Sequence, residues 1–544
     1  MKTLLLGNII TIDDNNPLAT ALICDKGIIE YVGSKEEAYK KCADGDIKVL
    51  DYGDNYIYPG FLESHTHGLF AGYRTSGQAD LTNCFDDKES MIEVIKEFIN
   101  DNPQKEVYVA QGWNETTGPL DYRFLDNILN DKPLVLNTGG GHSCLLNSKA
   151  MEYYGINKET LNKYGSDLVR IDENGELTGY ICEEPAIKLI GQLPISFEEG
   201  KNFVLKWQDI AFSKGITAVG DAGAELIYKK ANEVYKTLDD ENKLKLRTYS
   251  YSLIADNEPN PKEAIENVVE LKKKFDGKHF EIIGVKAFLD GVLEARTSWT
   301  VEGYADDSNY HGLQRFADLE KMIELIKEAS KNNLAVHVHS EGDGATKFML
   351  DCIEESIKET NDYDQRNVLA HLHIVKENDI KRMGETKSIP AVPPLWTPKF
   401  PGGYEKEVGY VGEERAFKSY PIKSFFSNGC KVVYHSDYPV SPILDISRSV
   451  FMAETRAIPE PQFGGIEKTT RNKQEAVSRM ESLKALTINI AYMFKKEKEM
   501  GSIEKGKMAN FAVLDKDLLN VDILEIPNTK TIATIVDGEE VFHI

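Results

Sequence analysis

The chain has 544 residues, 41% of them hydrophobic and 28% charged, which indicates a soluble globular protein that is too long for one compact core. Its formal net charge of −24 disfavours nucleic acid as a partner, because an acidic surface repels phosphate backbones. The seven cysteines are scattered and form no CxxC pair, so we expect reduced thiols in a cytoplasm and neither a disulfide framework nor a zinc knuckle.

The N-terminal segment is expected to be part of the fold and not a signal peptide. Its apolar run is broken at Gly7 and Asn8, and acidic residues begin at Asp13. No stretch of the sequence approaches the roughly 18 uninterrupted apolar residues that a membrane span needs. We therefore expect no membrane partner.

The two ends of the chain share a pattern of short strands. Strand-like runs separated by turn signals occupy residues 3–12, 20–33, 47–58 and 509–544. This pattern predicts one small β-sandwich formed from both termini, residues 1–55 and 498–544. Two unrelated edge hairpins are the alternative interpretation.

Between the two ends, short apolar or β-branched runs alternate with helix-like segments such as 320–331 and 344–360. The runs are residues 56–64, 216–220, 245–253, 281–289, 334–340, 368–374, 388–395 and 431–436. Eight buried runs alternating with helices are what an α/β fold of the (β/α)8 type, the TIM barrel, requires. We place the first barrel strand in residues 56–70 and the remainder of the barrel in residues 205–497.

Residues 71–204 interrupt this alternation. They contain strands and helices of their own and a glycine-rich turn at Gly139–Gly141. We predict an α+β insertion after the first barrel strand. Because the loops at the carboxyl face of a barrel carry specificity, we expect this insertion to pack over the barrel mouth.

Histidines gather at the ends of the predicted strands. His65 and His67 close the first run, and residues i and i+2 of a strand face the same side, so both imidazoles can reach one point. An HxH pair alone is a weak signal, because most such pairs are surface or hydrogen-bonded histidines. Further candidates end the fifth, sixth and eighth runs: His337, His339, His371, His373 and Asp437. Barrel strand ends on one face converge on the active site.

This grouping predicts a metal site. Neutral imidazoles clustered with a carboxylate suit a divalent transition metal, with zinc as the default, bound as one or two ions. Three other histidines, His279, His311 and His543, are expected on the surface.

Lys286 ends the fourth run, in GVKAFLDG. A charged lysine is costly to bury in an apolar strand, so its pKa is expected to fall. One interpretation is a snorkelling lysine paired with Asp290. The other is a neutral amine that reacts with carbon dioxide and gives a carbamate able to bridge two metals.

The order of these residues resembles the amidohydrolase superfamily: HxH on the first strand, lysine on the fourth, histidine on the fifth and sixth, and aspartate on the eighth. Finer motifs resemble amidohydrolase family 3 and its YtcJ-like branch, which includes N-substituted formamide deformylase. These motifs are PGFLESHTHG, GWN at 112–114, GHSCLLNSKA at 141–150, GVKAFLDG at 284–291, HSEGD at 339–343 and SDYPV at 436–440. The resemblance covers nearly the whole chain, and its motifs are specific for the family but not for a substrate.

The resemblance implies a ligand set and a general base. The implied metal ligands are His65, His67, Lys286 in carboxylated form, His339, His371 and Asp437, with Asp437 also the general base. His339 is preferred to His337 because it stands four residues before Asp343, as in the family's HxxGD stretch. His371 is preferred to His373 because RNVLAHLHIV aligns with the family's RHRIEHA segment there. Their spacing of two residues from these ligands keeps His337 and His373 facing inward; we expect them to pack beside or support the ligands, and a ligand role for either one stays open.

The resemblance also implies substrate contacts. His142 matches a family histidine that binds substrate, and Trp113 and Arg296 are further candidates to line the pocket or to be structural. Two positions depart from the family pattern. Ala370 replaces a glutamate, so a supporting carboxylate is missing or supplied elsewhere. His435 replaces glycine or another small residue, and an extra inward imidazole there would narrow the pocket or change the substrate.

We therefore expect a metal-dependent hydrolase that cleaves a non-peptide carbon–nitrogen bond in a small-molecule amide, formamide or N-acyl amine. A metal-activated hydroxide would attack the carbonyl, and Asp437 would pass the proton to the departing nitrogen. Hydrolysis of an ester, lactone or carbamate and deamination of a ring are alternatives. A further alternative is a protein without catalytic activity that serves as a regulatory scaffold, because some relatives of this branch carry a label as regulators of exoenzyme production. For the oligomeric state of the protein, we consider a homodimer.

Overall fold

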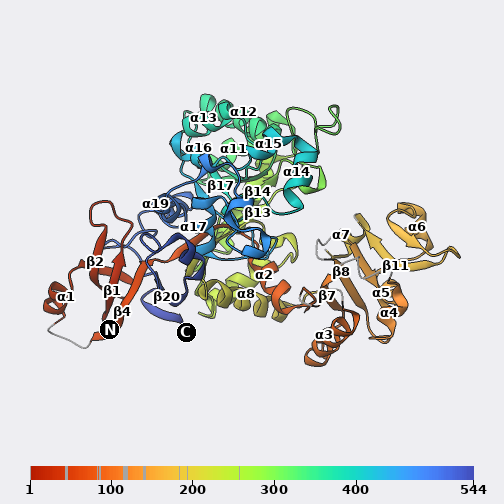
Figure 1. Ribbon diagram of the computed structural model, residues 1–544, viewed down its shortest axis with the longest axis horizontal. Coiled ribbons are helices and arrows are strands. Elements are labelled where there is room, and N and C mark those ends of the chain that lie inside the picture. Colours follow the sequence, from red (N-terminus) through yellow and green to blue (C-terminus); the bar gives the residue numbers. More distant parts are fainter. Residues whose placement is uncertain are drawn as a thin grey trace. The chain divides into compact units, whose positions relative to one another are not determined.

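The computed structural model divides into two compact units (Figure 1). The barrel unit comprises Met1–Gly68, Gln208–Ala224 and Tyr235–Ile544, and the insertion unit comprises Leu69–Trp207 and Glu225–Val234. The structure describes residues 2–42, 47–82, 84, 87–113, 120–138, 143–182, 184–190, 192, 194–256 and 258–544. None of the helices in those ranges combines the length and the apolar character that a bilayer crossing requires.

In the described part of the barrel unit, eight parallel strands form one sheet in the order β5–β12–β13–β14–β15–β16–β17–β18. Their bounds are β5 Phe61–Thr66, β12 Ile216–Asp221, β13 Arg247–Leu253, β14 Phe280–Phe288, β15 Ala335–Ser340, β16 Val368–His371, β17 Ile389–Val392 and β18 Val433–Tyr434. At the seam between β5 and β18, Ser64 Oγ donates a hydrogen bond to the Tyr434 carbonyl at 2.7 Å. Each of the eight predicted runs overlaps one of these strands, so the predicted barrel is confirmed.

Helices separate the barrel strands along the chain, and the first two of them begin in the insertion unit and end in the barrel unit. They are α8 Phe197–Phe212, α9 Ala231–Asp240, α10 Pro261–Lys274, α11 Leu319–Lys331, α12 Asp343–Thr360, α13 Glu377–Glu385, α14 Gly403–Val411, α15 Glu413–Phe417, α16 Ile422–Ser427, α17 Ile446–Thr455, α18 Gly465–Thr469, α19 Arg479–Ala485 and α20 Ile488–Met493. In α11 the Asp318 carboxylate caps the N-terminus by accepting from Lys321 N, and the apolar residues that follow at helical spacing are buried. The predicted helical segments 320–331 and 344–360 are therefore α11 and α12.

The described parts of both termini form one seven-stranded sheet, in the order β21–β20–β19–β4–β1–β2–β3. The bounds are β1 Lys2–Ile10, β2 Leu18–Asp25, β3 Ile28–Gly33, β4 Ile47–Pro59, β19 Phe511–Leu514, β20 Thr531–Val536 and β21 Glu539–His543, with α1 at Lys35–Lys41. β19 pairs antiparallel with β4, so the C-terminal strands extend the N-terminal sheet (Figure 1, red and dark blue). Leu22 of β2 and Ala533 of β20 share one core although their strands are not neighbours, so the sheet folds over on itself. The predicted sandwich is confirmed, and the alternative of two unrelated hairpins is wrong.

Asp537, the residue after β20, ties the terminal sheet to the barrel. Its carboxylate accepts from Arg247 at 2.6 Å, from Lys278 at 2.6 Å and from His279 Nε2 at 3.3 Å. The other ring nitrogen of His279 lies 3.2 Å from a carboxylate oxygen of Asp239. His279 is only 5% exposed, so its expected place on the surface is wrong: two carboxylates satisfy a ring that would otherwise be costly to bury.

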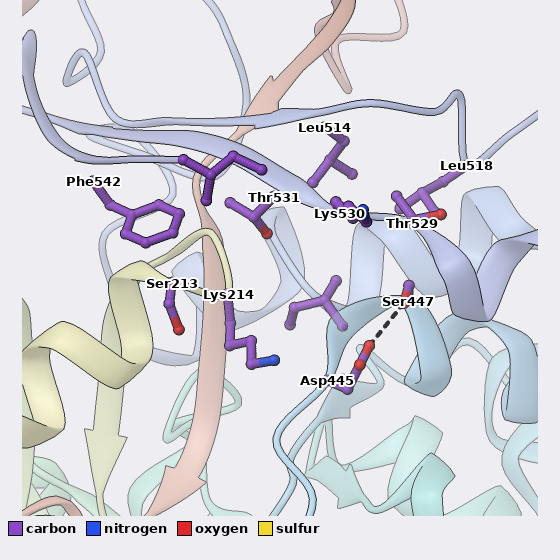
Figure 2. A pocket seen from close by; sticks show the side chains of 12 residues that line it. Ser213, Lys214, Asp445, Ser447, Leu514, Leu518, Thr529, Lys530, Thr531 and Phe542 are labelled. Atoms are coloured by element: carbon purple, nitrogen blue, oxygen red, sulfur yellow. Dashed lines mark hydrogen bonds between the residues drawn. The ribbon is translucent and has the colours of Figure 1, made fainter.

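A cavity of about 270 Å³ lies between this sheet and the barrel (Figure 2). Lys214 lines it from the barrel side, while Thr531 and Phe542 line it from β20 and β21. At the start of α17, Ser447 Oγ donates to the Asp445 carboxylate at 2.7 Å, which satisfies both groups locally. None of the predicted site residues is among the residues that line this cavity.

The insertion unit contains a separate mixed sheet, built in the described ranges from strands in the order β10–β11–β9–β8–β7–β6. Its strands are β6 Ala79–Asp80, β7 Tyr108–Trp113, β8 Leu134–Thr138, β9 Ser143–Leu146, β10 Val169–Ile171 and β11 Leu177–Cys182, and its helices are α2 Gly68–Ser76, α3 Lys88–Asp101, α4 Tyr122–Asp126, α5 Ser148–Tyr154, α6 Lys158–Tyr164 and α7 Glu184–Ile190. Adjacent residues of β8 face opposite cores, Val135 on one side and Leu136 on the other. The predicted α+β insertion after the first barrel strand is confirmed. Its location over the barrel mouth stays a prediction, and Gly139–Gly141 lies outside the described residues.

Candidate metal centre

The carboxyl ends of the barrel strands carry the predicted metal ligands. His65 lies near the end of β5 with His67 just beyond it, Lys286 and His339 lie near the ends of β14 and β15, His371 ends β16, and Asp437 follows β18. His65, Lys286, His339, His371 and Asp437 are all at most 7% exposed. The structure therefore gathers buried imidazoles, an amine and a carboxylate at one end of a parallel barrel, where barrel active sites form.

His65, His67 and Asp437 form the tightest group. The Nε2 atoms of His65 and His67 lie 3.4 and 3.2 Å from Asp437 Oδ1, and one ligand atom from each residue lies within 4.8 Å of the others. The two histidines thus direct their rings to one point, as the HxH spacing predicts. Three converging donors of this kind can hold one divalent ion.

The backbone at two of these positions is held in the left-handed region. Asp437 has φ 58° and His371 has φ 80°, values that are costly for residues with a side chain. Beside Asp437, Ser436 donates from its backbone N and its Oγ to Glu63 at 2.9 and 3.2 Å. Burial raises the pKa of Glu63 to about 8. The Glu63–Ser436 contacts fix the turn that presents Asp437.

His339 is oriented by a buried carboxylate. Its Nδ1 lies 2.9 Å from Asp290 Oδ1, which leaves Nε2 for another partner. The Asp290 carboxylate also accepts from the backbone N of Trp299, Glu341 and Gly342, at 3.0, 3.1 and 2.8 Å. A ligand histidine held through its second nitrogen in this way is typical of protein metal sites.

Lys286 does not form the ion pair with Asp290 that was one interpretation of the sequence. It is 1% exposed, and its Nζ has no hydrogen-bond partner among the described residues; Asp290 bonds His339 instead. Burial lowers the pKa of Lys286 to about 7, although the charges of Asp437 and Asp290 oppose the shift. At neutral pH a large fraction of this amine is unprotonated, as a metal ligand or a carbamate precursor must be.

His371 is surrounded by other rings. Its ring centroid lies 4.5 Å from that of His339 and 5.0 Å from that of His435. Trp396, which ends the short helix η4 (Pro394–Trp396), stacks on His371 at 5.7 Å and 6°, and meets His435 edge-on at 5.9 Å and 82°. The sequence pattern did not identify Trp396 as a site residue. Its position depends on the turn after β17, and a turn has no periodic signal.

The titration states in this group suit metal binding. Burial holds the pKa of His65, His337 and His371 well below the ordinary value and that of His435 at about 4, so these imidazoles are neutral. Burial alone would raise the pKa of Asp437, but His67 outweighs it and keeps that pKa below the ordinary value. Neutral imidazoles beside an ionised carboxylate are the donor set of a divalent transition metal, and the residues present therefore fit such an ion.

His373 does not face this group. β16 ends at His371, and both His371 and Leu372 have positive φ, so the strand alternation used to place His373 stops there. His373 Nε2 lies 3.0 Å from Glu407 Oε1. Burial opposes protonation of this ring, but Glu407 and Glu341 raise its pKa to about 10. The expectation that His373 faces inward is wrong.

The remaining predicted substrate contacts are scattered. Trp113 ends β7 in the insertion unit, where it is 4% exposed and meets Tyr180 edge-on at 6.3 Å. Arg296 donates to Asp306 at 2.8 Å and lies over the rings of three tyrosines, Tyr304, Tyr310 and Tyr410. His142 lies outside the described residues. His435 belongs to the ring group, while the substrate roles of Trp113, Arg296 and His142 stay predictions.

Buried carboxyl groups occur near the site even though Ala370 replaces the family's glutamate. Asp290 orients His339, and Glu63 holds the turn before Asp437. Glu63 is two residues before His65 on β5, so the same alternation that groups His65 with His67 could have identified it. The family pattern alone gave it no role.

The known proteins that this chain resembles in sequence include amidohydrolases. The amidohydrolase family matches residues 48–542. YtcJ of Bacillus subtilis, provisionally named an amidohydrolase, is 25% identical over 99% of this chain and 98% of its own length. N-substituted formamide deformylase of Arthrobacter pascens is 24% identical over 98% of this chain and 96% of its own length.

A solved structure has the same fold. The crystal structure of an uncharacterized metal-dependent hydrolase from Pyrococcus horikoshii covers 96% of this chain and 99% of its own, with a TM-score of 0.77 and 23% identity. The predicted family resemblance is confirmed, since the family match spans most of the sequence and two relatives align over nearly the full length. The chain belongs to the amidohydrolase family.

Proposed function

We propose that the protein is a metal-dependent hydrolase of a non-peptide carbon–nitrogen bond in a small amide, formamide or N-acyl amine. The observation that carries the proposal is the convergence of His65, His67 and Asp437 at the strand ends of an amidohydrolase barrel. N-substituted formamide deformylase, a relative over nearly the full chain, acts on a bond of this class, as its name states.

His65, His67 and Asp437 would hold one divalent ion, with zinc as the default. Lys286, His339 and His371 would complete this site or hold a second ion. When bound, the metal polarises a carbonyl and lowers the pKa of a water to near neutrality. A neutral Lys286 amine can add to carbon dioxide, forming an N–C bond and releasing one proton, and the resulting carbamate would supply two oxygens to the site.

Asp437 is the proposed general base. Its pKa is held below the ordinary carboxyl value, so it is ionised and can accept the proton of the attacking water. It then delivers that proton to the departing nitrogen, which leaves as an amine while the acyl group leaves as a carboxylic acid. Its left-handed backbone fixes the direction of the carboxylate before substrate arrives.

His435 is the proposed substrate contact. No side chain among the described residues hydrogen-bonds its ring nitrogens, and the ring is 1% exposed beside His65 and His371. A neutral imidazole has one N–H, which can donate to a substrate carbonyl oxygen. Because this ring stands where the family has a small residue, it would reduce the space available for the acyl group and favour small ones such as formyl.

A matched substrate panel tests the proposal. The full-length protein, loaded with zinc, is assayed against N-formyl and N-acetyl amines and against formate and acetate esters of the same alkyl groups, with release of amine or alcohol as the readout. We expect amine release, with formyl substrates cleaved faster than acetyl. Faster ester cleavage would replace the proposal with an esterase, and no turnover of any member by the metal-loaded protein would count against it.

A further inference from the structure

His337 contacts His65, and the reaction proposed above assigns no role to this contact. Its Nε2 lies 2.9 Å from Nδ1 of His65, and both rings are at most 1% exposed. The ring centroids are 4.8 Å apart at an interplanar angle of 70°, so the two rings meet at an edge. On its other side His337 packs edge-on against Tyr251, at 4.6 Å and 76°.

Only one direction of this hydrogen bond is compatible with a metal on His65. The Nε2 atom of His65 faces Asp437, on the side where the metal is proposed to bind. A nitrogen that binds a metal carries no proton, so the single proton of a neutral His65 must be on Nδ1. It then donates to His337 Nε2, which must accept. The opposite direction would place a proton on His65 Nε2 and block the metal.

We propose that His337 is a positioning residue for the metal site: by accepting from Nδ1–H of His65, it fixes the tautomer and the ring orientation that present Nε2 of His65 to the metal. This inference rests on the metal site proposed above. It assigns a role to a histidine that none of the family motifs contains, and it pairs His337 with His65 as Asp290 is paired with His339.

The position of His337 in the barrel supports this role. It is the register partner of Lys286 on the neighbouring strand β14 and stands two residues before His339 on β15, so it lies one layer deeper in the barrel than His339. From that position its Nε2 reaches Nδ1 of His65 at 2.9 Å. Its other ring nitrogen, Nδ1, has no hydrogen-bond partner in the described part of the chain, so the only polar contact of the ring there is with His65.

Metal affinity of full-length variants tests the proposal. His337→Leu removes the acceptor, whereas His337→Gln keeps an amide oxygen that can take the place of Nε2. Zn²⁺ affinity is measured by competition with a chromophoric chelator, and melting temperature is measured with and without Zn²⁺. Losing such a supporting partner typically weakens metal affinity about 10- to 100-fold, so we expect that loss for leucine and recovery of most of it for glutamine. The matched control is Tyr251→Phe, which alters the other side of the His337 ring and should bind Zn²⁺ as the wild type does.

The melting data separate positioning from a purely structural role. We expect the metal-free His337→Leu protein to melt no lower than the metal-free wild type, while the rise in melting temperature on adding Zn²⁺ shrinks. Equal Zn²⁺ affinity in wild type and His337→Leu, or equal losses in the leucine and glutamine variants, would overturn the inference and leave the proposed function intact. A wild type that binds no Zn²⁺ would overturn both.

Discussion

Asp437 is placed so that its two proposed tasks can be tested separately. Its carboxylate lies within 3.4 Å of Nε2 of both His65 and His67, and it is ionised. The backbone that carries it is fixed by contacts between Ser436 and Glu63, which do not involve the Asp437 side chain. A change confined to the carboxylate should therefore leave the turn in place.

Replacing Asp437 with asparagine should separate metal binding from proton transfer. Asp437→Asn keeps the shape and one carbonyl oxygen, so we expect a folded protein that still binds metal. An amide cannot accept a proton near neutral pH, and loss of a positioned general base typically lowers the rate about 100- to 10,000-fold. Metal content, melting temperature and turnover are measured on the same preparation.

The comparison variant is His65→Ala, which should lose metal and turnover together. If Asp437 were only a structural acid, Asp437→Asn would lower the melting temperature and leave turnover per folded molecule unchanged. Near-normal turnover of a folded, metal-loaded Asp437→Asn protein would contradict the proposed mechanism.

Asp290 should be as important for stability as for the metal site. Its two oxygens accept from His339 and from the backbone N of Trp299, Glu341 and Gly342. In Asp290→Asn, an NH2 group replaces one oxygen and faces N–H donors, so buried donors lose their acceptor at about 1–3 kcal/mol each. We expect a lower free energy of unfolding in urea, by about 2 kcal/mol or more. Asp306→Asn, at a partly exposed ion pair with Arg296, is the control and should change it by less than about 1 kcal/mol.

Residues in regular strands could be placed from the sequence, and residues at strand ends could not. The HxH spacing grouped His65 with His67 correctly, because alternation holds within β5 and the residue that follows it. The same rule failed at His373, because β16 stops at His371 and the backbone there takes positive φ. Such a turn leaves no periodic signal. The surroundings of Lys286 likewise depend on Asp290 bonding His339, a contact between distant parts of the chain.

Among the secondary-structure elements, the terminal sheet and the barrel are joined by a charged cluster around Asp537, called the joint below. Asp537 at the end of β20 accepts from Arg247 at the start of β13 and from Lys278 and His279 before β14. The strands themselves could be predicted from apolar runs and turn signals. This polar contact could not be predicted, because a cluster between segments 258 to 290 residues apart has no local pattern. For the same reason His279 looked like a surface residue.

The Asp537 cluster predicts a specific pH dependence of stability. Burial opposes ionisation, yet His279, Arg247 and Lys278 outweigh it and hold the pKa of Asp537 well below the ordinary value. A carboxyl whose pKa is lowered by folding stabilises the folded state above its unfolded pKa, about 4, and this stabilisation is lost as the pH falls below that value. We expect Asp537→Asn to be less stable than wild type at pH 7 and the difference to shrink below about pH 4.

Urea unfolding at several pH values, with Asp256→Asn as the control, measures this difference. Asp256 is an exposed carboxylate paired with Arg315, so its replacement should change the free energy of unfolding little at any pH. A difference between wild type and Asp537→Asn that stays constant from pH 7 to pH 3 would show that the joint does not depend on the charge of Asp537.

For the molecule as a whole, the division into two units determines which unit a bound metal would stabilise. All the residues proposed to hold it, His65, His67, Lys286, His339, His371 and Asp437, belong to the barrel unit. The insertion unit has separate cores on the two faces of its own sheet. The barrel, the terminal sandwich and the inserted sheet could each be predicted from strand and helix periodicity. Periodicity gives no information about how the two units sit together, because that depends on side-chain contacts between distant segments.

Metal removal should therefore destabilise one unit selectively. A ligand that binds only the folded state stabilises it by about 2.7 kcal/mol at 100 times its dissociation constant, and this stabilisation belongs to the unit that supplies the ligands. We expect Zn²⁺ to slow amide hydrogen exchange in β5, β16 and the turn at Asp437, and to leave β8 and β9 of the insertion unit unchanged. A chelator should reverse the effect and abolish turnover. Protection of both units to the same degree would contradict a metal held by the barrel alone, and selective protection without turnover on any amide would favour a silent scaffold over an enzyme.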